Sequence, residues 1–325
     1  MKMLVVGGAG YIGSHMVKML SRAGNDVVTI DNLSEGYRDA VKYGQFVLGD
    51  LADRAALDAL FRANHFDGVM HFASFIQAGE SVIDPGKYFR NNVANTQNLL
   101  DAMVEHRVHH FIFSSTAAIY GEPQYVPIDE AHPSRPINPY GRSKLMVEEM
   151  LGDYDRAHDL KSVCLRYFNA AGADPDGELG ERHDPESHLI PLVLQAASGR
   201  RDSITIFGTD YDTPDGTCIR DYIHVQDLCT AHLLALEHLS KNSRSDTFNL
   251  GNGSGFSIRE VVNIAREVTG RSIVEVIGKR REGDAARLVA DSTRARNELG
   301  WIPERHQLEV IIADAWRWER TQARA

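Results

Sequence analysis

Gly7-Gly-Ala-Gly-Tyr-Ile-Gly13 is a glycine-rich turn that directly follows the apolar run Met3-Leu-Val-Val6. Gly7 permits a tight turn, Gly10 lets the backbone approach a pyrophosphate, and Gly13 lets the next helix lie close to the sheet. Amide groups at the start of that helix attract the anion. Glycines also occur in ordinary turns, but strand, glycines and helix in this order favour nucleotide binding. The sequence therefore predicts a dinucleotide-binding α/β fold.

Short apolar runs alternate with helical patterns through the first half of the chain. Strands are expected at residues 3–6, 27–30, 46–48, 69–72, 111–113 and 163–166. Helices are expected at residues 12–23, 54–64, about 88–105, and 140–158. The alternation predicts a Rossmann-type, doubly wound parallel sheet with right-handed crossovers and helices on both faces.

Asp31 closes the second expected strand. A carboxylate there would hydrogen-bond the adenosine ribose and repel a 2′-phosphate, so NAD is favoured over NADP as the cofactor. A turn or helix cap at Asp31 and Asn32 is the structural alternative. Asp50, which follows Leu48-Gly49, is expected to contact the adenine.

The second half of the chain is less regular. A loop rich in Gly, Asp and Glu is expected up to His188, then a helix from Pro191 and a strand at 204–207. We predict an NAD-binding domain over residues 1–170 and a smaller, mainly substrate-binding α/β region over 171–325. Segments near 225–250 are expected to return to the first domain. With no linker of low complexity between the regions, a ligand cleft between them is the default hypothesis.

Tyr140 and Lys144 lie one helical turn apart in Asn138-Pro-Tyr-Gly-Arg-Ser-Lys144, so one helix face would carry both. Thr116 ends the run Phe111-Ile-Phe-Ser-Ser-Thr116, where a parallel sheet presents polar groups at its carboxyl edge. The phenol has an ordinary pKa of about 10, so it acts as a base near neutrality only when its anion is stabilised. Lys144 and a nicotinamide cation would stabilise it. A tyrosine and a lysine at this spacing are common on helix surfaces, so the pair alone favours a structural role. Together with the glycine turn and Thr116, the pair predicts a catalytic role.

Composition excludes several classes of protein. The chain has 325 residues, 43% of them hydrophobic and 25% charged, which are ordinary values for a soluble globular protein. The formal net charge of -10 argues against a nucleic-acid partner, because sequence-independent binding needs a basic face. No apolar run is long enough to span a membrane, and no secretory leader precedes the first strand, so a cytoplasmic location is expected.

The cysteines and histidines of the chain predict neither a disulfide nor a metal site. Cys164, Cys218 and Cys229 are too scattered for a disulfide framework and are expected to be buried thiols. Near 106–110 three histidines gather at a helix end, where a solvated last turn is favoured over a metal cluster. No metal is assigned.

The chain resembles the extended short-chain dehydrogenase/reductase family over nearly its whole length. The motifs that carry the resemblance are GGAGYIG, Asp31, Gly49-Asp50-Leu51, His71-Phe-Ala73, SSTAAIYG and the pair Tyr140 and Lys144. Matches to the nucleotide-sugar epimerases of that family are AGESV, PYGRSK, LRYFNAAGA, TPDGTCIRDYIHV and RREGD.

This resemblance implies an isomerase that reversibly epimerises C4 of UDP-glucose and UDP-galactose through transient NAD-dependent oxidation to a 4-keto sugar. Tyr140 would be the base and then the acid, and Thr116 would orient the sugar hydroxyl. Lys144 would anchor the nicotinamide ribose and lower the pKa of Tyr140. The implied cofactor-binding residues are Gly7, Gly10, Tyr11, Ile12, Gly13, Asp31, Asn32, Asp50, Leu51, Phe72, Ala73, Asn91, Tyr140 and Lys144. The implied substrate-binding residues are Thr116, Tyr140, Asn169, His188, Leu189, Thr205, Phe207, Arg220, Arg281 and Asp284.

Particular positions bear on the choice between related activities. Dehydratases and decarboxylases of the family carry an acid beside the catalytic threonine, whereas Ala117 and Ala118 follow Thr116 here, which favours simple epimerisation. Ile76 stands where the best-known bacterial form has lysine and Leu288 where it has tyrosine, so a cofactor contact is missing and the sugar pocket is altered.

Three hypotheses stay open at this point. The first is a UDP-glucose/UDP-galactose epimerase, the second a related enzyme acting on UDP-N-acetylglucosamine, UDP-glucuronate or a UDP-pentose, and the third a non-catalytic NAD-binding regulator. By resemblance a homodimer is expected, paired through apolar stripes on the helices at 88–105 and 140–158.

Overall fold

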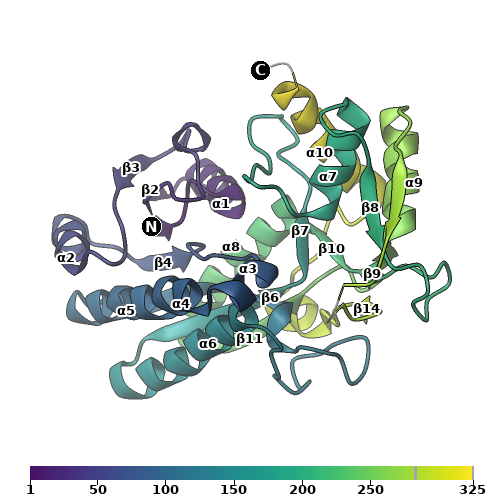
Figure 1. Ribbon diagram of the computed structural model, residues 1–325. Helices are drawn as coiled ribbons and strands as arrows, with labels where there is room; N and C mark the ends of the chain where they lie inside the picture. Colours follow the sequence, from purple (N-terminus) through teal and green to yellow (C-terminus); the bar gives the residue numbers. More distant parts are fainter. Residues whose placement is uncertain (282–283, 324–325) are drawn as a thin grey trace.

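The central sheet lies in the part of the chain that the computed structural model describes, residues 1–281 and 284–323 (Figure 1). It has seven parallel strands in the order β11-β6-β5-β4-β1-β2-β3. The strands are β1 (Lys2–Val6), β2 (Asp26–Asp31), β3 (Gln45–Leu48), β4 (Gly68–His71), β5 (His110–Thr116), β6 (Lys161–Tyr167) and β11 (Asp246–Leu250). The predicted Rossmann-type fold class is confirmed.

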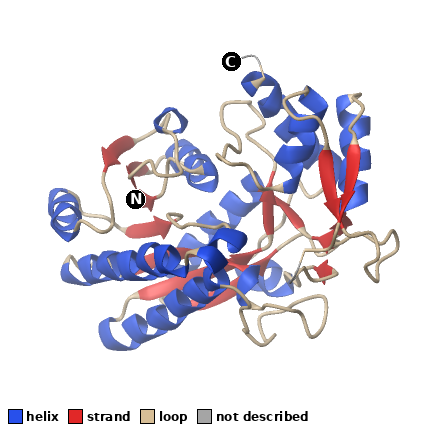
Figure 2. Cartoon of the chain, in the orientation of Figure 1, coloured by secondary structure: helices blue, strands red, loops and turns tan. Residues whose placement is uncertain are grey.

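Helices cover both faces of this sheet, as Figure 2 shows. The helices on one face are α1 (Tyr11–Arg22) and α8 (Val225–Asn242), and those on the other are α2 (Arg54–Ala63), α5 (Asn95–Glu105) and α6 (Pro139–His158). Successive side chains of a strand point to opposite faces. Accordingly Met3 and Val5 belong to the apolar cluster under α1, whereas Leu4 and Val6 belong to the cluster under α2 and α5.

The strand order reverses at β1. This strand pairs with β2 on one side and with β4 on the other, so that Val6 lies opposite both Ile30 and His71. The connections that leave β1 and β4 then diverge to opposite faces, which opens a crevice at the carboxyl ends of these two strands. The glycine-rich turn begins there, at Gly7.

The helix expected over residues 88–105 is interrupted. After α3 (Ala78–Ile83) the chain forms α4 (Pro85–Tyr88), a π-helical segment η2 (Phe89–Ala94) and then α5. Within η2 the buried Asn92 accepts a hydrogen bond from the Phe75 amide and donates one to the Phe75 carbonyl, both at 3.0 Å. A widened turn of this kind re-aims one side chain inside a helix, and here it turns Asn92 toward the loop after β4.

A second layer of helices packs beyond the central sheet, on the side coloured green to yellow in Figure 1. The helices α7 (Leu189–Ser198), α9 (Ile258–Thr269) and α10 (Leu308–Gln322) share one apolar cluster. The short strands there form three small sheets, β8 (Ile204–Phe207) with β13 (Glu275–Gly278), β7 (Asn169–Ala171) with β10 (Tyr222–His224), and β9 (Ile219–Arg220) with β12 (Phe256–Ser257) and β14 (Arg287–Leu288). The remaining short helical segments are η1 (Arg38–Ala40), η3 (Ala117–Ile119) and η4 (Ala295–Leu299).

Two segments from beyond residue 170 pack on the first sheet. Strand β11 pairs with β6, and α8 packs against β5 and β6. A division of the chain at residue 170 stays a prediction.

Cys164, Cys218 and Cys229 are free and buried, as predicted. Among the described helices, none has the combination of length and apolar character needed to cross a membrane.

Candidate active site

A cavity of about 330 Å³ lies at the crevice between β1 and β4. Every cofactor-binding residue expected from the sequence lines it, as do four of the expected substrate-binding residues, Thr116, Tyr140, Asn169 and His188. The structure thus brings together the glycine turn, the end of β2, the end of β4, the end of β5 and the start of α6.

The glycine turn is shaped as a cradle. Gly7 has φ +79°, and a Cβ there would lie 2.5 Å from the Ala73 amide nitrogen. A Cβ at Gly13 would collide with the Gly7 carbonyl, so the helix rests directly on the turn. Gly10 differs, because a Cβ added there would have the Gly7 carbonyl oxygen as its nearest neighbour, at an acceptable 3.4 Å. The protein itself does not fill the space over Gly10, which fits a pyrophosphate lying against the first amides of α1.

Asp31 is oriented by backbone amides. Its Oδ2 accepts from Ala9 at 2.9 Å and its Oδ1 accepts from Leu33 at 2.8 Å. Burial raises the pKa of this carboxyl group, and the two amides partly offset the effect. Asp31 therefore caps the turn that follows β2, which was the structural alternative. Its carboxylate also lines the cavity. Beside it, Asn32 donates to Asp50 at 2.8 Å, which joins two further predicted residues.

The Lys144 ammonium is buried under the cavity wall. Its Nζ donates to Ser74 Oγ at 2.7 Å and to the Ser114 carbonyl at 2.8 Å, and lies 4.7 Å from the centre of the Phe113 ring. Burial lowers the pKa of Lys144 to about 7. Ser74 was not predicted from the sequence, although its place directly after the motif at the end of β4 was a usable signal.

Tyr140 lies in the first turn of α6, which Asn138 caps by accepting from the Gly141 amide at 2.8 Å. Burial raises the pKa of Tyr140, and the neighbouring Thr116 hydroxyl partly offsets this rise. In the part of the chain that the structure describes, the hydrogen bonds of Lys144 go to Ser74 and Ser114. The expected lowering of the Tyr140 pKa by Lys144 stays a prediction.

An ion pair behind the site ties its elements together. Glu148 of α6 accepts from Arg166 Nε, whose one hydrogen is shared between the two carboxylate oxygens at 3.0 and 3.1 Å, from Arg166 Nη2 at 2.5 Å, and from Ser115 of β5. Only 8% of the Glu148 side chain and 11% of the Arg166 side chain are exposed. Arg166 also donates to the Tyr120 hydroxyl, which donates to Asn249 at 2.7 Å. This network holds the end of β5, and with it Thr116, against α6.

Four other predicted substrate residues form a separate group. The Arg281 guanidinium pairs with Asp284 at 2.9 Å and lies 4.9 Å from the centre of the Phe207 ring, and Arg220 approaches Asp284 at 3.5 Å. These residues, with Leu189 and Thr205, are not among the described residues that line the cavity. Arg220 is largely buried, whereas 60% of the Arg281 side chain is exposed.

The two positions that depart from the family pattern lie in different places. Ile76 lines the cavity. Leu288 packs against the small apolar cluster of Ile119, Tyr120 and Ile128, just after Thr116.

Further lining residues were not assigned from the sequence: four of them lie in the quoted motifs AGESV and LRYFNAAGA without a predicted role, and the others lie on loops and short helices outside any motif. They are Ser34, Glu35, Gly36, Ser74, Phe75, Gln77, Glu80, Tyr88, Tyr167, Phe168, Ala170, Glu181, His183 and Ser187.

The fold and the cavity are those of a dinucleotide-binding α/β protein. Residues 3–251 match the NAD dependent epimerase/dehydratase family, and the chain belongs to that family.

Named relatives match over almost the whole chain. The UDP-glucose 4-epimerase of Halalkalibacterium halodurans is 52% identical over 98% of this chain and 96% of its own. The crystal structure of UDP-glucose 4-epimerase from Brucella ovis in complex with NAD is 51% identical, with a TM-score of 0.95 over 97% of each chain. That of the Bifidobacterium longum enzyme in complex with NAD+ and UDP is 38% identical, with a TM-score of 0.94 over 99% of this chain and 98% of its own.

Proposed function

We propose that the protein interconverts UDP-glucose and UDP-galactose by epimerisation at C4, with NAD as its cofactor. One observation carries the proposal: the glycine turn, Asp31, Thr116, Tyr140 and Lys144 line one cavity in a chain that belongs to an NAD-dependent epimerase family. The relatives named above, which match along nearly the full length, support the choice of reaction.

The cradle over Gly10 and the carboxylate of Asp31 fit the pyrophosphate and the adenosine ribose of NAD, respectively. When bound, NAD accepts a hydride from C4 of the sugar and later returns it. Lys144, fixed by Ser74 and Ser114, is the residue that would hold the nicotinamide ribose.

Tyr140 and Thr116 perform the proton transfer. Thr116 hydrogen-bonds the C4 hydroxyl and directs its proton toward the Tyr140 oxygen. Tyr140, present as the phenolate that Lys144 and a nicotinamide cation would stabilise, takes that proton while the C4 hydrogen leaves with its electron pair, and the C–O bond becomes a carbonyl. After the 4-keto sugar has turned over, Tyr140 gives the proton back as the hydride returns to the opposite face.

The sugar turns over only if the protein holds the nucleotide firmly and the sugar loosely. Binding energy then comes from the unreactive part of the substrate. The group of Phe207, Arg220, Arg281 and Asp284 offers a ring for the uracil and cations for the pyrophosphate.

The first test is incubation of the purified protein with UDP-galactose, without added NAD, and quantification of UDP-glucose. We expect conversion, because the cofactor is expected to copurify. If neither UDP-glucose nor UDP-galactose is converted with or without added NAD, the proposal fails. Conversion of only UDP-N-acetylglucosamine, UDP-glucuronate or a UDP-pentose would select the related epimerases, and NAD binding without any turnover would indicate a regulator.

Arg281→Ala is expected to weaken UDP binding about tenfold while kcat changes less than twofold, because the interaction is made equally in the ground and transition states. Calorimetric titration with UDP and steady-state kinetics with UDP-galactose measure the two effects. Arg280→Ala is the matched control, since Arg280 pairs with Asp210 and lies over Tyr211. An unchanged affinity for UDP in the Arg281 variant would remove this residue from the substrate site.

The expected homodimer and the cytoplasmic location stay predictions.

A further inference from the structure

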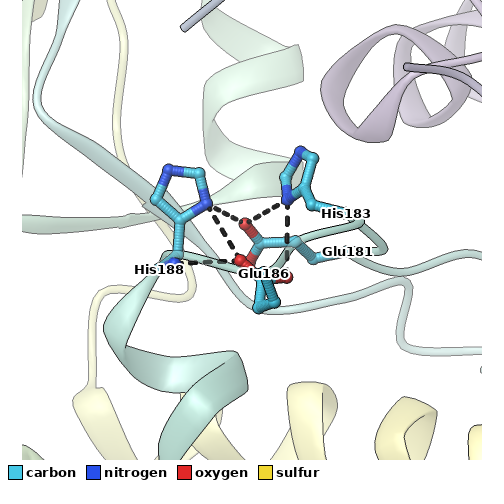
Figure 3. A group of neighbouring side chains, drawn as sticks. All are labelled: Glu181, His183, Glu186 and His188. Carbon is cyan, nitrogen blue, oxygen red and sulfur yellow. Dashed lines mark hydrogen bonds and ion pairs between the residues drawn. The ribbon is translucent and has the colours of Figure 1, made fainter. Parts of the chain in front are cut away.

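Glu181, His183, Glu186 and His188 gather on the loop that leads into α7 (Figure 3). In the figure the two imidazoles and the two carboxylates face one another. One ligand atom from each residue lies within 4.8 Å of the other three. No metal was predicted from the sequence, in which only the histidines near residue 106 resembled a ligand group.

Two of the distances in the cluster match the edges of a tetrahedron around one small cation. His183 Nδ1 lies 3.4 Å from Glu181 Oε1 and 3.4 Å from Glu186 Oε2. His188 Nδ1 lies 2.6 Å from Glu181 Oε1 and 3.5 Å from Glu186 Oε1. Four ligands at about 2.0–2.1 Å from a zinc ion are separated by about 3.3 Å. With Glu186 Oε2 as the ligand atom, the two edges at His183 are within a few tenths of that length, the edge from His188 to Glu181 is shorter, and the 3.5 Å distance goes to the other oxygen of Glu186.

Hydrogen-bond geometry does not account for three of these side-chain atoms. Glu181 Oε1, His183 Nδ1 and His188 Nδ1 are buried and close enough to bond, at 2.6 Å for His188 to Glu181, but by angle none of the three makes a hydrogen bond. Only 5% of the Glu181 side chain is exposed. A buried polar atom without a hydrogen bond is costly, and the atoms here point into the space that they share. The Glu181 backbone is fixed from outside, because its carbonyl accepts from Trp318 at 3.0 Å.

Glu186 has two roles in the cluster. Its Oε1 accepts from the backbone amides of Ser187 and His188, at 2.8 and 2.9 Å, so the carboxylate is oriented before any ligand arrives. Its Oε2 is the oxygen nearer His183.

The alternative is a closed group of two imidazolium and two carboxylate ions. Burial opposes protonation of the histidines, but the two carboxylates outweigh it and raise the pKa of His188 to about 10 and of His183 to about 9. In such a group each N–H should point at a carboxylate oxygen; the Nδ1 atoms lie near the oxygens, at 2.6 Å for His188 and Glu181, but their angles do not fit a hydrogen bond.

A second cluster of two acidic residues and a histidine, in the described part of the chain, differs from this one in having an arginine beside it. Asp58, Glu105 and His106 also approach one another. Arg54 lies 3.1 Å from Asp58 and 2.6 Å from Glu105, so a side-chain cation already neutralises that group. Within the described residues, the ion pairs of Glu181 and Glu186 are with the two histidines alone.

We propose that Glu181, His183, Glu186 and His188 bind one divalent transition-metal ion, best matched by Zn²⁺. Imidazole nitrogen and carboxylate oxygen are ordinary zinc ligands, and four protein ligands make a closed, structural site. Glu181, His183 and His188 also line the cavity, and His188 directly precedes α7. The ion therefore fixes the part of the cavity wall next to Tyr11, whose ring centre lies 6.5 Å from that of His183. This proposal does not depend on which nucleotide sugar the protein converts.

The test measures Zn²⁺ binding by the full-length chain without a histidine tag, after dialysis against a chelator. Calorimetric titration should give about one Zn²⁺ per chain, and Co²⁺ should give the intense visible bands of tetrahedral coordination. His183→Ala and the isosteric Glu186→Gln should each weaken Zn²⁺ binding at least about tenfold. His109→Ala, which removes an exposed histidine elsewhere, should bind like the parent.

Absence of Zn²⁺ binding by the parent would overturn the proposal and favour the closed ion-pair group. Equal Zn²⁺ affinity in the parent and in Glu186→Gln would also overturn it, because the metal would then lie elsewhere. The Co²⁺ spectrum of the parent needs no variant, so the test stands even if His183→Ala fails to fold, which circular dichroism would reveal.

Discussion

Replacing Tyr140 with phenylalanine is expected to lower kcat for UDP-galactose about 100- to 10,000-fold, the range that general acid–base groups contribute. The half-buried phenol lies at the start of α6, beside the Thr116 hydroxyl. Ala117 and Ala118, which follow Thr116, supply no acid or base in its place. Removing one oxygen atom leaves the ring and its packing intact, so the variant should fold and keep its NAD.

Tyr154→Phe is the matched control for this experiment. Tyr154 lies on the same helix and donates its hydroxyl proton to Asp101, away from the cavity. Its kcat should stay within about twofold of the parent. Absorbance of the released cofactor, measured for both variants, separates loss of chemistry from loss of NAD. A Tyr140 variant that keeps more than a tenth of the parental kcat would exclude Tyr140 as the base.

Replacing Glu148 with alanine is expected to lower the free energy of unfolding by about 3–5 kcal/mol, the usual cost of leaving one buried charge without its partner. Arg166 would lose the carboxylate that accepts its bonds, and Ser115 would lose its acceptor. Since Arg166 is only 11% exposed, water cannot replace that partner freely. Urea unfolding of the NAD-saturated protein measures the effect.

Glu149→Ala changes the net charge equally at an exposed neighbouring position and should change the free energy of unfolding by less than about 0.5 kcal/mol. Adding Arg166→Met to Glu148→Ala should recover part of the loss, because the double variant buries no charge. Equal stability of the two glutamate variants would show that the ion pair contributes nothing to the fold.

Most of the central sheet could be predicted because its strands are buried on both faces. Such strands appear in the sequence as continuous apolar runs, and the runs at 3–6 and 111–113 lie within β1 and β5. The interruption of the helix over 88–105 could not be predicted in this way. It depends on the hydrogen bonds between Asn92 and Phe75, which are made across a loop.

The residues of the candidate site likewise fall into those that the sequence could predict and those that it could not. Residues in motifs at strand ends, such as Asp31 and Thr116, line the cavity as the topology requires. Ser74 and the cluster around Glu181 were missed, because their importance comes from partners brought near by folding. The alternation of glutamate and histidine from Glu181 to His188 was visible in the sequence, but no known ligand spacing marked it.

The position of β11 has a consequence for biosynthesis. A ribosome delivers β1 to β6 well before residues 225–250, which supply α8 and β11. During that interval β6 is an open edge that invites pairing with other chains, and apolar residues of β5 and β6 such as Ile112 and Leu165 lack the cover of α8. The nascent chain therefore passes through an aggregation-prone stage that ends only when its last third has been synthesised. Molecular chaperones are expected to bind the chain during that stage.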